Sequence, residues 1–283
     1  MRRAVLLLAT MALAILLAGG VAHAIINGEP DRGPNAHPYV GALVSVPTSG
    51  EFKGQRIPIC SGTLISARVF LTAGHCTDTI AEENLPTYVS LDPTYEAGSS
   101  RLIRGTAHTH PKYCLPTKEV VCAPKSPDYP LNDVGVVVLD EPVSMATYGA
   151  LPKAGLVDTL DEGQPLTVVG YGTTGFDIDI GGESPLQPQP VLPQDRYRAT
   201  VRLLNTENLD VGERFVKTMG IGIGGGGEGA CYGDSGGPLF VPDQQTIVGV
   251  TSTGVPKASL CRGPGYYQRM DLPRVFSWIR SFL

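Results

Sequence analysis

The sequence predicts an all-β protein. The chain of 283 residues contains 35 glycines and 24 prolines, which is a loop-rich composition. Its apolar residues occur in short runs separated by Gly, Pro and Asn, a pattern typical of strands joined by turns. Long amphipathic stretches are missing until the C-terminus. The length fits one domain or two closely packed halves.

The strand-like runs divide into two groups. In the first half we expect strands at residues 39–46, 62–66, 69–72, 102–106 and 134–139. A linking stretch at 148–163 is followed by runs at 166–172, 198–203 and 246–251. Near the C-terminus, Pro273 precedes the run 276–280 and suits the first turn of a helix.

Residues 1–24 have the features of a secretory signal peptide. Arg2 and Arg3 supply positive charge, and residues 22–24 read Ala-His-Ala, a small-x-small cleavage site. The apolar run between them, roughly 15 residues, is shorter than the roughly 20 that a membrane-spanning helix needs. We therefore expect a secreted, extracellular protein without a stable membrane anchor.

The charge balance argues against nucleic acid as a partner. The chain has 22 Lys and Arg residues against 27 Asp and Glu, a formal net charge of -5, and no basic stripe. Its mild acidity favours solubility. We expect a monomer that needs no cofactor.

Six cysteines in an exported chain predict three disulfides, for which fifteen pairings exist. Zinc is the competing use of cysteine in such a chain. No two of the cysteines have C-x-x-C spacing, which argues against a zinc site.

Three short motifs carry a histidine, an acid and a serine. His75 lies in Leu-Thr-Ala-Gly-His-Cys, Asp133 in Asn-Asp-Val-Gly, and Ser235 in Gly-Asp-Ser-Gly-Gly-Pro. A serine hydroxyl is a poor nucleophile unless a base takes its proton. Imidazole can be that base, and a carboxylate on its other nitrogen fixes the tautomer. The motifs therefore predict nucleophilic acyl transfer.

The order of these residues favours one kind of hydrolase over two others. Gly-x-Ser-x-Gly around Ser235 also matches the nucleophile elbow of α/β-hydrolases, but no histidine follows Ser235. The subtilisin order would need Asp78 and His108, and neither has a supporting motif. The order His, Asp, Ser is that of chymotrypsin.

These stretches resemble the secreted serine proteases of the chymotrypsin/trypsin family. The resemblance covers nearly the whole chain after residue 24. Besides the three motifs it includes segments at both ends and one upstream of the histidine: Ile25-Ile26-Asn27-Gly28, Trp278-Ile279 and Cys60-Ser61-Gly62. The apolar run after Asp133 strengthens the match of the short Asn-Asp motif.

The resemblance implies a fold of two packed six-stranded antiparallel β-barrels with a C-terminal helix. The protease domain would span 25–283, with an N-terminal barrel at about 25–147 and a C-terminal barrel at about 148–283. His75 and Asp133 would come from the first barrel and Ser235 from the second. The active site would then lie in the cleft between the barrels.

The resemblance also selects among the disulfide pairings. It implies a bond beside the histidine, a bond beside the serine, and a third between the remaining two cysteines: Cys60–Cys76, Cys231–Cys261 and Cys114–Cys122. His108 and His110 would lie on one side of a strand and could reach a metal together. Because His110-Pro111 resembles a surface turn of the family, we predict no metal.

Around Ser235 the resemblance implies two further roles. The backbone N–H groups of Gly233 and Ser235 would form an oxyanion hole. Asp234 would pair with the α-amino group of Ile25, because a buried carboxylate without a partner is costly. Since Ile25 follows the predicted cleavage after Ala24, export itself would expose this group. Cleavage a few residues earlier, followed by trimming, is the alternative.

The resemblance places the primary specificity pocket at Gly229, Ser252, Gly254 and Gly265. An aspartate at the floor would select Arg or Lys, but Gly229 stands there, and Gly254 and Gly265 leave the walls open. This favours large apolar or aromatic side chains before the scissile bond. Glu228, beside the floor, leaves the opposite preference open.

The predicted function is a secreted serine endopeptidase that acts on proteins or peptides through an acyl-enzyme. A catalytically inactive homologue that binds partners is one alternative, and the presence of all three catalytic residues argues against it. An esterase of the same fold is another, because the same chemistry would serve.

Two Pro-rich loops, 114–132 and 181–193, are expected to run over the surface. They either frame the cleft or have no role in the site.

Overall fold

The computed structural model describes residues 25, 28–34, 36–116, 122, 130–172, 194–204, 214–220, 229–254, 261 and 263–283. The predicted signal peptide, Glu228, the loop 181–193 and most of the loop 114–132 lie outside these residues. Within the described part, no helix is both long and apolar enough to cross a membrane.

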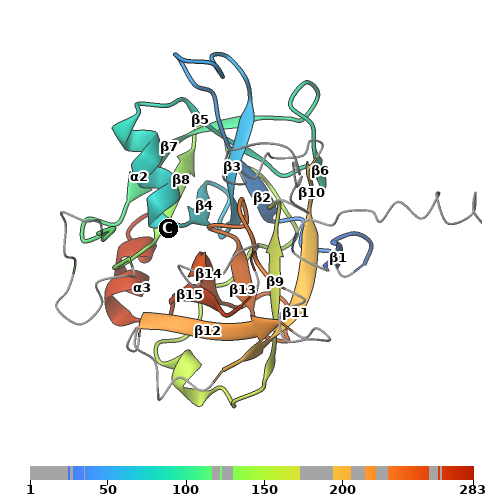
Figure 1. Cartoon of the computed structure of the whole chain (residues 1–283), viewed down its shortest axis with the longest axis vertical. Coiled ribbons are helices and arrows are strands. Elements are labelled where there is room, and N and C mark those ends of the chain that lie inside the picture. Colours follow the sequence, from blue (N-terminus) through green and yellow to red (C-terminus); the bar gives the residue numbers. More distant parts are fainter. Residues whose placement is uncertain are drawn as a thin grey trace, which may run out of the picture.

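Six antiparallel strands of the first half close into a barrel, in the upper part of Figure 1. Around the barrel the order is β2 (Val40–Ser45), β3 (Ile57–Leu64), β4 (Val69–Thr72), β8 (Gly135–Leu139), β7 (Ile103–Thr109) and β5 (Thr87–Ser90). Each of these strands pairs with two neighbours, so the barrel leaves no free edge.

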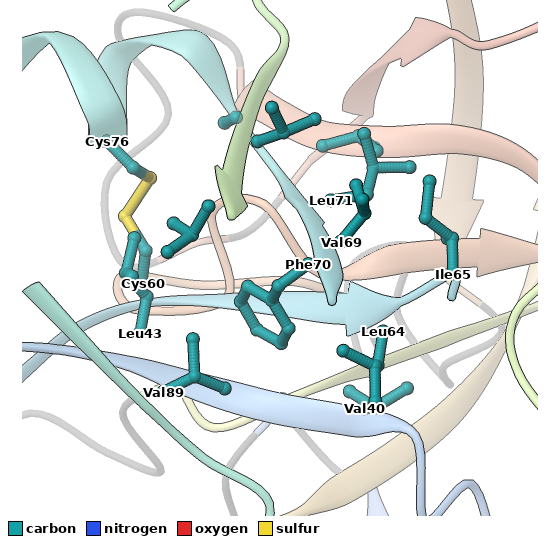
Figure 2. Packing of buried hydrophobic residues seen from close by; sticks show 14 of the residues in the cluster. Val40, Leu43, Cys60, Leu64, Ile65, Val69, Phe70, Leu71, Cys76 and Val89 are labelled. Carbon is teal, nitrogen blue, oxygen red and sulfur yellow. A yellow bond between two sulfur atoms is a disulfide. The ribbon is translucent and has the colours of Figure 1, made fainter. Parts of the chain in front are cut away.

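Apolar side chains fill this first barrel. In Figure 2 the ring of Phe70 lies among Leu43, Leu64 and Val89, and all four side chains are fully buried. A Cβ at Gly62 would meet the Phe70 ring and would lie 2.5 Å from the backbone oxygen of Leu71. Only glycine fits at this approach of β3 to β4.

The second half forms a second closed barrel, in the lower part of Figure 1. Its order is β9 (Pro165–Gly170), β11 (Tyr197–Leu203), β12 (Phe215–Gly220), β15 (Gly265–Arg269), β14 (Ile247–Gly254) and β13 (Pro238–Phe240), which returns to β9. A short strand, β1 (Glu29–Pro30), pairs with β11. The two-stranded pair β6 (Thr94–Tyr95) and β10 (Gln194–Asp195) connects the two halves.

The predicted all-β class and pair of six-stranded barrels are confirmed. One helix was not predicted: α2 (Gly74–Glu82) begins within the histidine motif and packs on β7 and β8. This helix receives no capping hydrogen bond from the side chain of its own N-cap residue, Ala73. It is held by tertiary contacts instead, namely the Cys60–Cys76 disulfide and the hydrogen bond of 2.8 Å between Thr77 and Thr109. A short 3-10 turn, η1 (Leu156–Thr159), precedes β9.

The C-terminal helix α3 (Pro273–Arg280) starts with Pro273 in its first turn, as predicted. It belongs to the second half but buries Val275 and Ile279 in the hydrophobic cluster of the first barrel. The ring of His110 lies 5.1 Å from that of Trp278 on this helix. The ring of His108 lies equally close to Phe282, just beyond α3. Both histidines therefore take part in the packing of the C-terminus.

A buried ion cluster ties the segment before β2 to the second barrel. Asp31 is fully buried and accepts a hydrogen bond of 2.7 Å from Nε of Arg196, which precedes β11. The backbone N–H of His37 donates to the same carboxylate, and its ring Nδ1 lies 2.8 Å from Oδ1. Burial raises the pKa of Asp31, but the hydrogen bonds and charges of His37 and Arg196 lower it below its ordinary value.

Candidate active site

The candidate base and acid are in direct contact. His75 lies in the first turn of α2, and its ring Nδ1 is 2.9 Å from Oδ2 of Asp133. The backbone N–H of His75 donates to Oδ1 of the same carboxylate at 2.7 Å. Asp133 is fully buried, whereas the His75 side chain is 27% exposed. The acid thus holds both the ring and the start of the helix, where a negative charge is favourable.

The two groups shift each other's pKa in opposite directions. Burial lowers the pKa of His75, but the charge of Asp133 and its hydrogen bond outweigh burial and raise it. Burial raises the pKa of Asp133, but the charge and hydrogen bond of His75 and the hydroxyl of Ser252 bring it below the ordinary value. The pair therefore stabilises an imidazolium beside an ionised carboxylate.

The Asn-Asp sequence shapes the turn that carries the acid. Asn132 has a φ of 48°, in the left-handed region that asparagine tolerates better than most residues. The N–H of Val134 donates to the oxygen of Asn132 at 2.7 Å, which makes the turn tight. The side-chain nitrogen of Asn132 donates to the backbone oxygen of Lys112 at 2.8 Å, and its Oδ1 accepts a hydrogen bond from Nε of Arg274 at 2.7 Å.

The serine turn is anchored on β3 of the first barrel. Ser61 donates its backbone N–H to the oxygen of Ser235 at 2.7 Å and its hydroxyl to the oxygen of Gly233 at 2.9 Å. Its hydroxyl oxygen also accepts the N–H of Tyr171 at 2.9 Å. Ser61 therefore fixes a loop of the second barrel against the first, a role that the motif Cys60-Ser61-Gly62 did not reveal.

A missing side chain brings the serine turn close to the histidine motif. Gly236 has a φ of 82°, and a Cβ there would lie 2.9 Å from the backbone nitrogen of Ala73 and would clash with the Thr72 hydroxyl. Gly236 follows Ser235, and Ala73 lies two residues before His75. The glycine of the serine motif thus lets the chain segments of Ser235 and His75 meet across the two barrels.

Ser235 opens onto a cavity of about 280 Å³. All four residues predicted for the specificity pocket line it, as do residues that the sequence did not single out: Gly229, Ser252, Gly254 and Gly265, together with Thr218, Tyr232 and Tyr267. Within the described residues, no acidic or basic side chain lines the cavity. Glu228 is outside that part of the chain.

The chain matches known proteins over most of its length. The family model for trypsin matches residues 25–279. The chain belongs to the trypsin family. It is 27% identical to human kallikrein-11 over 287 residues, which cover 98% of this chain and 86% of the relative. It is also 27% identical to a trypsin of Phaedon cochleariae over 291 residues, which cover 96% and 97% of the two chains.

Solved structures share the fold at lower sequence identity. Neuropsin, a serine protease expressed in the limbic system of mouse brain, has a TM-score of 0.61 at 23% identity. The match covers 90% of this chain and 98% of neuropsin. Human heparin binding protein has a TM-score of 0.56 at 20% identity, with 91% and 96% covered. Together the family match and the relatives identify the chain as a serine endopeptidase.

The structure of this trypsin-family chain contains the three disulfides that the resemblance implied: Cys60–Cys76, Cys114–Cys122 and Cys231–Cys261. The first joins β3 to the helix that carries His75, as Figure 2 shows. Both cysteines of the third line the cavity beside Ser235. Two of the three bonds thus brace the candidate site.

Asp234 is fully buried next to the candidate nucleophile. Its Oδ1 accepts the N–H of Gly172 and its Oδ2 the N–H of Cys231, both at 2.8 Å. It makes no ion pair within the described residues, and burial raises its pKa to about 7. Ile25 is fully buried in the apolar cluster of the second barrel. In the full chain the nitrogen of Ile25 is part of a peptide bond and carries no charge.

Ser252 has a position that the sequence analysis did not anticipate. It was predicted as a pocket residue, and it does line the cavity. Its hydroxyl also donates to Oδ2 of Asp133 at 2.5 Å. The same residue therefore connects the specificity cavity to the acid that holds His75.

Proposed function

We propose that this trypsin-family endopeptidase hydrolyses peptide bonds with Ser235 as nucleophile, His75 as general base and Asp133 as the acid that orients the base. The observation that carries the proposal is the contact of 2.9 Å between His75 Nδ1 and Asp133 Oδ2. The Ser235 turn lies against the same histidine motif, because Gly236 approaches the backbone of Ala73 closely. With the proposed boundary near residue 147, the N-terminal barrel contributes His75 and Asp133 and the C-terminal barrel contributes Ser235.

In the proposed mechanism, Nε2 of His75 takes the hydroxyl proton as Ser235 Oγ attacks the scissile carbonyl. Asp133 stabilises the imidazolium without taking its proton. His75 then protonates the leaving amine, and a water molecule, activated by the same imidazole, hydrolyses the acyl-enzyme.

The oxyanion hole is proposed at the N–H groups of Gly233 and Ser235. Neither group donates to a backbone acceptor within the described part of the chain. Their neighbours Asp234, Gly236 and Gly237 all do, so the turn leaves these two donors available. Removing one such donor in related chemistry costs roughly 3–4 kcal/mol of transition-state stabilisation.

Secretion as a monomer belongs to the same proposal. The signal-like residues 1–24 and three disulfides support an oxidising destination outside the cell. Nucleic acid is not a proposed partner, given the net charge of -5. The proposed partners are protein or peptide substrates. Purification of the secreted form, with N-terminal sequencing and sedimentation, tests the start at Ile25 and the monomeric state together.

The proposed preference before the scissile bond is for bulky uncharged side chains. No ionised group of the described chain lines the cavity, so a substrate cation there would be buried without a partner. The cavity is not wholly apolar, because Thr218, Thr251 and Ser252 are among its lining residues. Tyrosine should therefore be accepted as well as Phe or Leu.

Profiling of the 25–283 form against a peptide library tests this preference. We expect cleavage after Tyr, Phe or Leu, and Glu228→Gln should change it by less than about threefold. If Glu228 turned its carboxylate into the pocket, the wild type would cleave after Arg or Lys and Glu228→Gln would abolish that cleavage. A profile dominated by Arg or Lys would refute the proposed preference.

The pKa of His75 sets the expected pH dependence. Catalysis needs neutral His75, so kcat/KM should rise with pH through the pKa of this residue. Because Asp133 raises that pKa, the midpoint should lie above the ordinary value of about 6.5. Asp133→Asn should lower both the rate and the midpoint. A midpoint that stays unchanged in Asp133→Asn would show that another group controls the profile.

Two other functions are distinguished by direct assay. A binding protein without activity would not react with a fluorophosphonate probe, whereas the proposed enzyme should. An esterase would turn over simple esters but not peptides of matched sequence. We expect both substrates to be cleaved, because the acyl-enzyme chemistry is shared.

A further inference from the structure

Gln268 is a buried polar residue that the mechanism above does not use. It lies on β15 of the second barrel and is fully buried. Its side-chain Oε1 nevertheless accepts a hydrogen bond of 3.1 Å from the backbone N–H of Asp133, which belongs to the first half of the chain. A buried amide is costly unless its polar atoms are paired, so this contact bears on how the site is built.

The other end of the same amide is anchored in the second barrel. Nε2 of Gln268 donates to the backbone oxygens of Arg214 and Arg269, both at 3.2 Å. Arg214 immediately precedes β12, and Arg269 ends the neighbouring strand β15. Because both of these partners are acceptors and the N–H of Asp133 is a donor, only one orientation of the amide satisfies all three.

The N–H of Asp133 has no alternative acceptor in the described backbone. The hydrogen bond that closes the tight turn runs from the N–H of Val134 to the oxygen of Asn132, so the N–H of Asp133 takes no part in it. Asp133 is fully buried, so water does not replace a lost partner there without rearrangement. Gln268 therefore satisfies a donor at the residue that carries the acid.

We propose that Gln268 is a positioning residue, which fixes the backbone of Asp133 so that its carboxylate faces His75; this rests on the proposed triad. The carboxylate is only two bonds from the backbone Cα, so a tilt of the turn moves it directly. It must meet the ring of His75, the backbone N–H of His75 and the hydroxyl of Ser252 at 2.9, 2.7 and 2.5 Å. Three contacts of this kind tolerate little displacement.

Three other ionisable groups near Asp133 make no hydrogen bond to the Gln268 side chain, whose partners within the described residues are the backbones of Asp133, Arg214 and Arg269. Asp78 on α2 and Tyr113 both interact electrostatically with Asp133. Arg274 on α3 reaches the turn through Asn132. A change in the titration of His75 would then report the alignment of Asp133 rather than a change in surrounding charge.

Gln268→Met in the 25–283 form tests the proposal, because it keeps the approximate shape and removes both hydrogen-bonding ends. The measurements are kcat per active site titrated with a fluorophosphonate, KM, and the NMR titration of His75 with its Nδ1–H resonance. We expect kcat to fall about 10- to 100-fold and KM to stay within about threefold. The pKa of His75 should fall, and its Nδ1–H resonance should shift.

Gln244→Met is the matched control. Gln244 is partly buried, and like Gln268 it is hydrogen-bonded through both ends of its amide, in this case to His37 and Thr167, away from the site. The Gln244→Met variant should have lower thermal stability than the wild type, with the same kcat per titrated site and the same pKa of His75. If Gln268→Met behaves like this control, the proposal is overturned.

Gln268→Glu is the second variant. Burial beside Asp133 favours the protonated form of the new carboxyl group, in which one oxygen accepts the N–H of Asp133 and the hydroxyl donates to one of the backbone oxygens that Nε2 of Gln268 now contacts. This variant should keep kcat within about fivefold of the wild type. The proposal is overturned if kcat falls as much in Gln268→Glu as in Gln268→Met. If Gln268→Met does not fold, a fall in kcat of more than tenfold in Gln268→Glu overturns it. The NMR titration needs no turnover, so it separates failure of this proposal from failure of Ser235 to act as the nucleophile.

Discussion

Replacing Ser235 with alanine is expected to leave a folded protein that has lost about a millionfold in kcat. The attacking oxygen is removed, while the anchoring contacts of this turn are made by the backbone of Ser235 and Gly233 and by Ser61. His75→Ala should cost nearly as much, because the serine has no base without it. Hydrolysis of a peptide substrate, normalised to the concentration of folded protein, measures both losses.

The double variant provides the sharper test of this pair. If Ser235 and His75 act as one unit, the double variant should be less than about tenfold slower than either single variant. Losses that multiply would mean that the two residues act independently and would contradict the triad. Thermal unfolding of each variant controls for loss of structure.

Adding one residue before Ile25 is expected to cost at least about 100-fold in activity, with the fold retained. The proposed α-ammonium of Ile25 must reach the buried carboxylate of Asp234, which sits between the cavity wall at Cys231 and the nucleophile Ser235. An extra residue replaces that ammonium with an uncharged peptide nitrogen. The comparison is between the 25–283 form and a Met-extended form whose intact mass is verified. Full activity in the extended form would refute the pairing.

The same carboxylate predicts opposite stability effects in the two forms. In the extended form burial raises the pKa of Asp234 to about 7, so its stabilising contribution is present at low pH and is lost as pH rises from about 4 to 7. Asp234→Asn should therefore stabilise the extended form at pH 8. In the form that begins at Ile25 it should destabilise by about 3 kcal/mol, because the buried ammonium loses its partner. Melting temperatures across pH measure both, and an equal effect in the two forms would contradict the pair.

The sequence was informative where a residue type has a specific chemical or backbone role. The three motifs, the paired cysteines and the glycines of the serine turn each have such a role. Several strands were predicted closely, and residues 69–72 coincide with β4. The pocket glycines at 229, 254 and 265 line the same cavity as Ser235.

The parts that were missed lack such a local signal. Strand β15 carries Gln268 and Arg269 in buried positions that look polar in sequence. Helix α2 has no capping side chain at its N-cap position and few apolar residues, so contacts distant in sequence determine it, among them the carboxylate of Asp133 and a disulfide. The contacts of Ser61, Ser252 and Gln268 join residues more than 100 positions apart, beyond the reach of any local pattern.

The residue that carries the acyl group is identified most directly by mass spectrometry of the 25–283 form after treatment with a fluorophosphonate. We expect one adduct per molecule, on Ser235, formed at a rate that falls steeply in His75→Ala, with peptide hydrolysis lost in proportion to labelling. An adduct on another residue, or full peptide hydrolysis by a protein labelled completely at Ser235, would contradict the proposed active site.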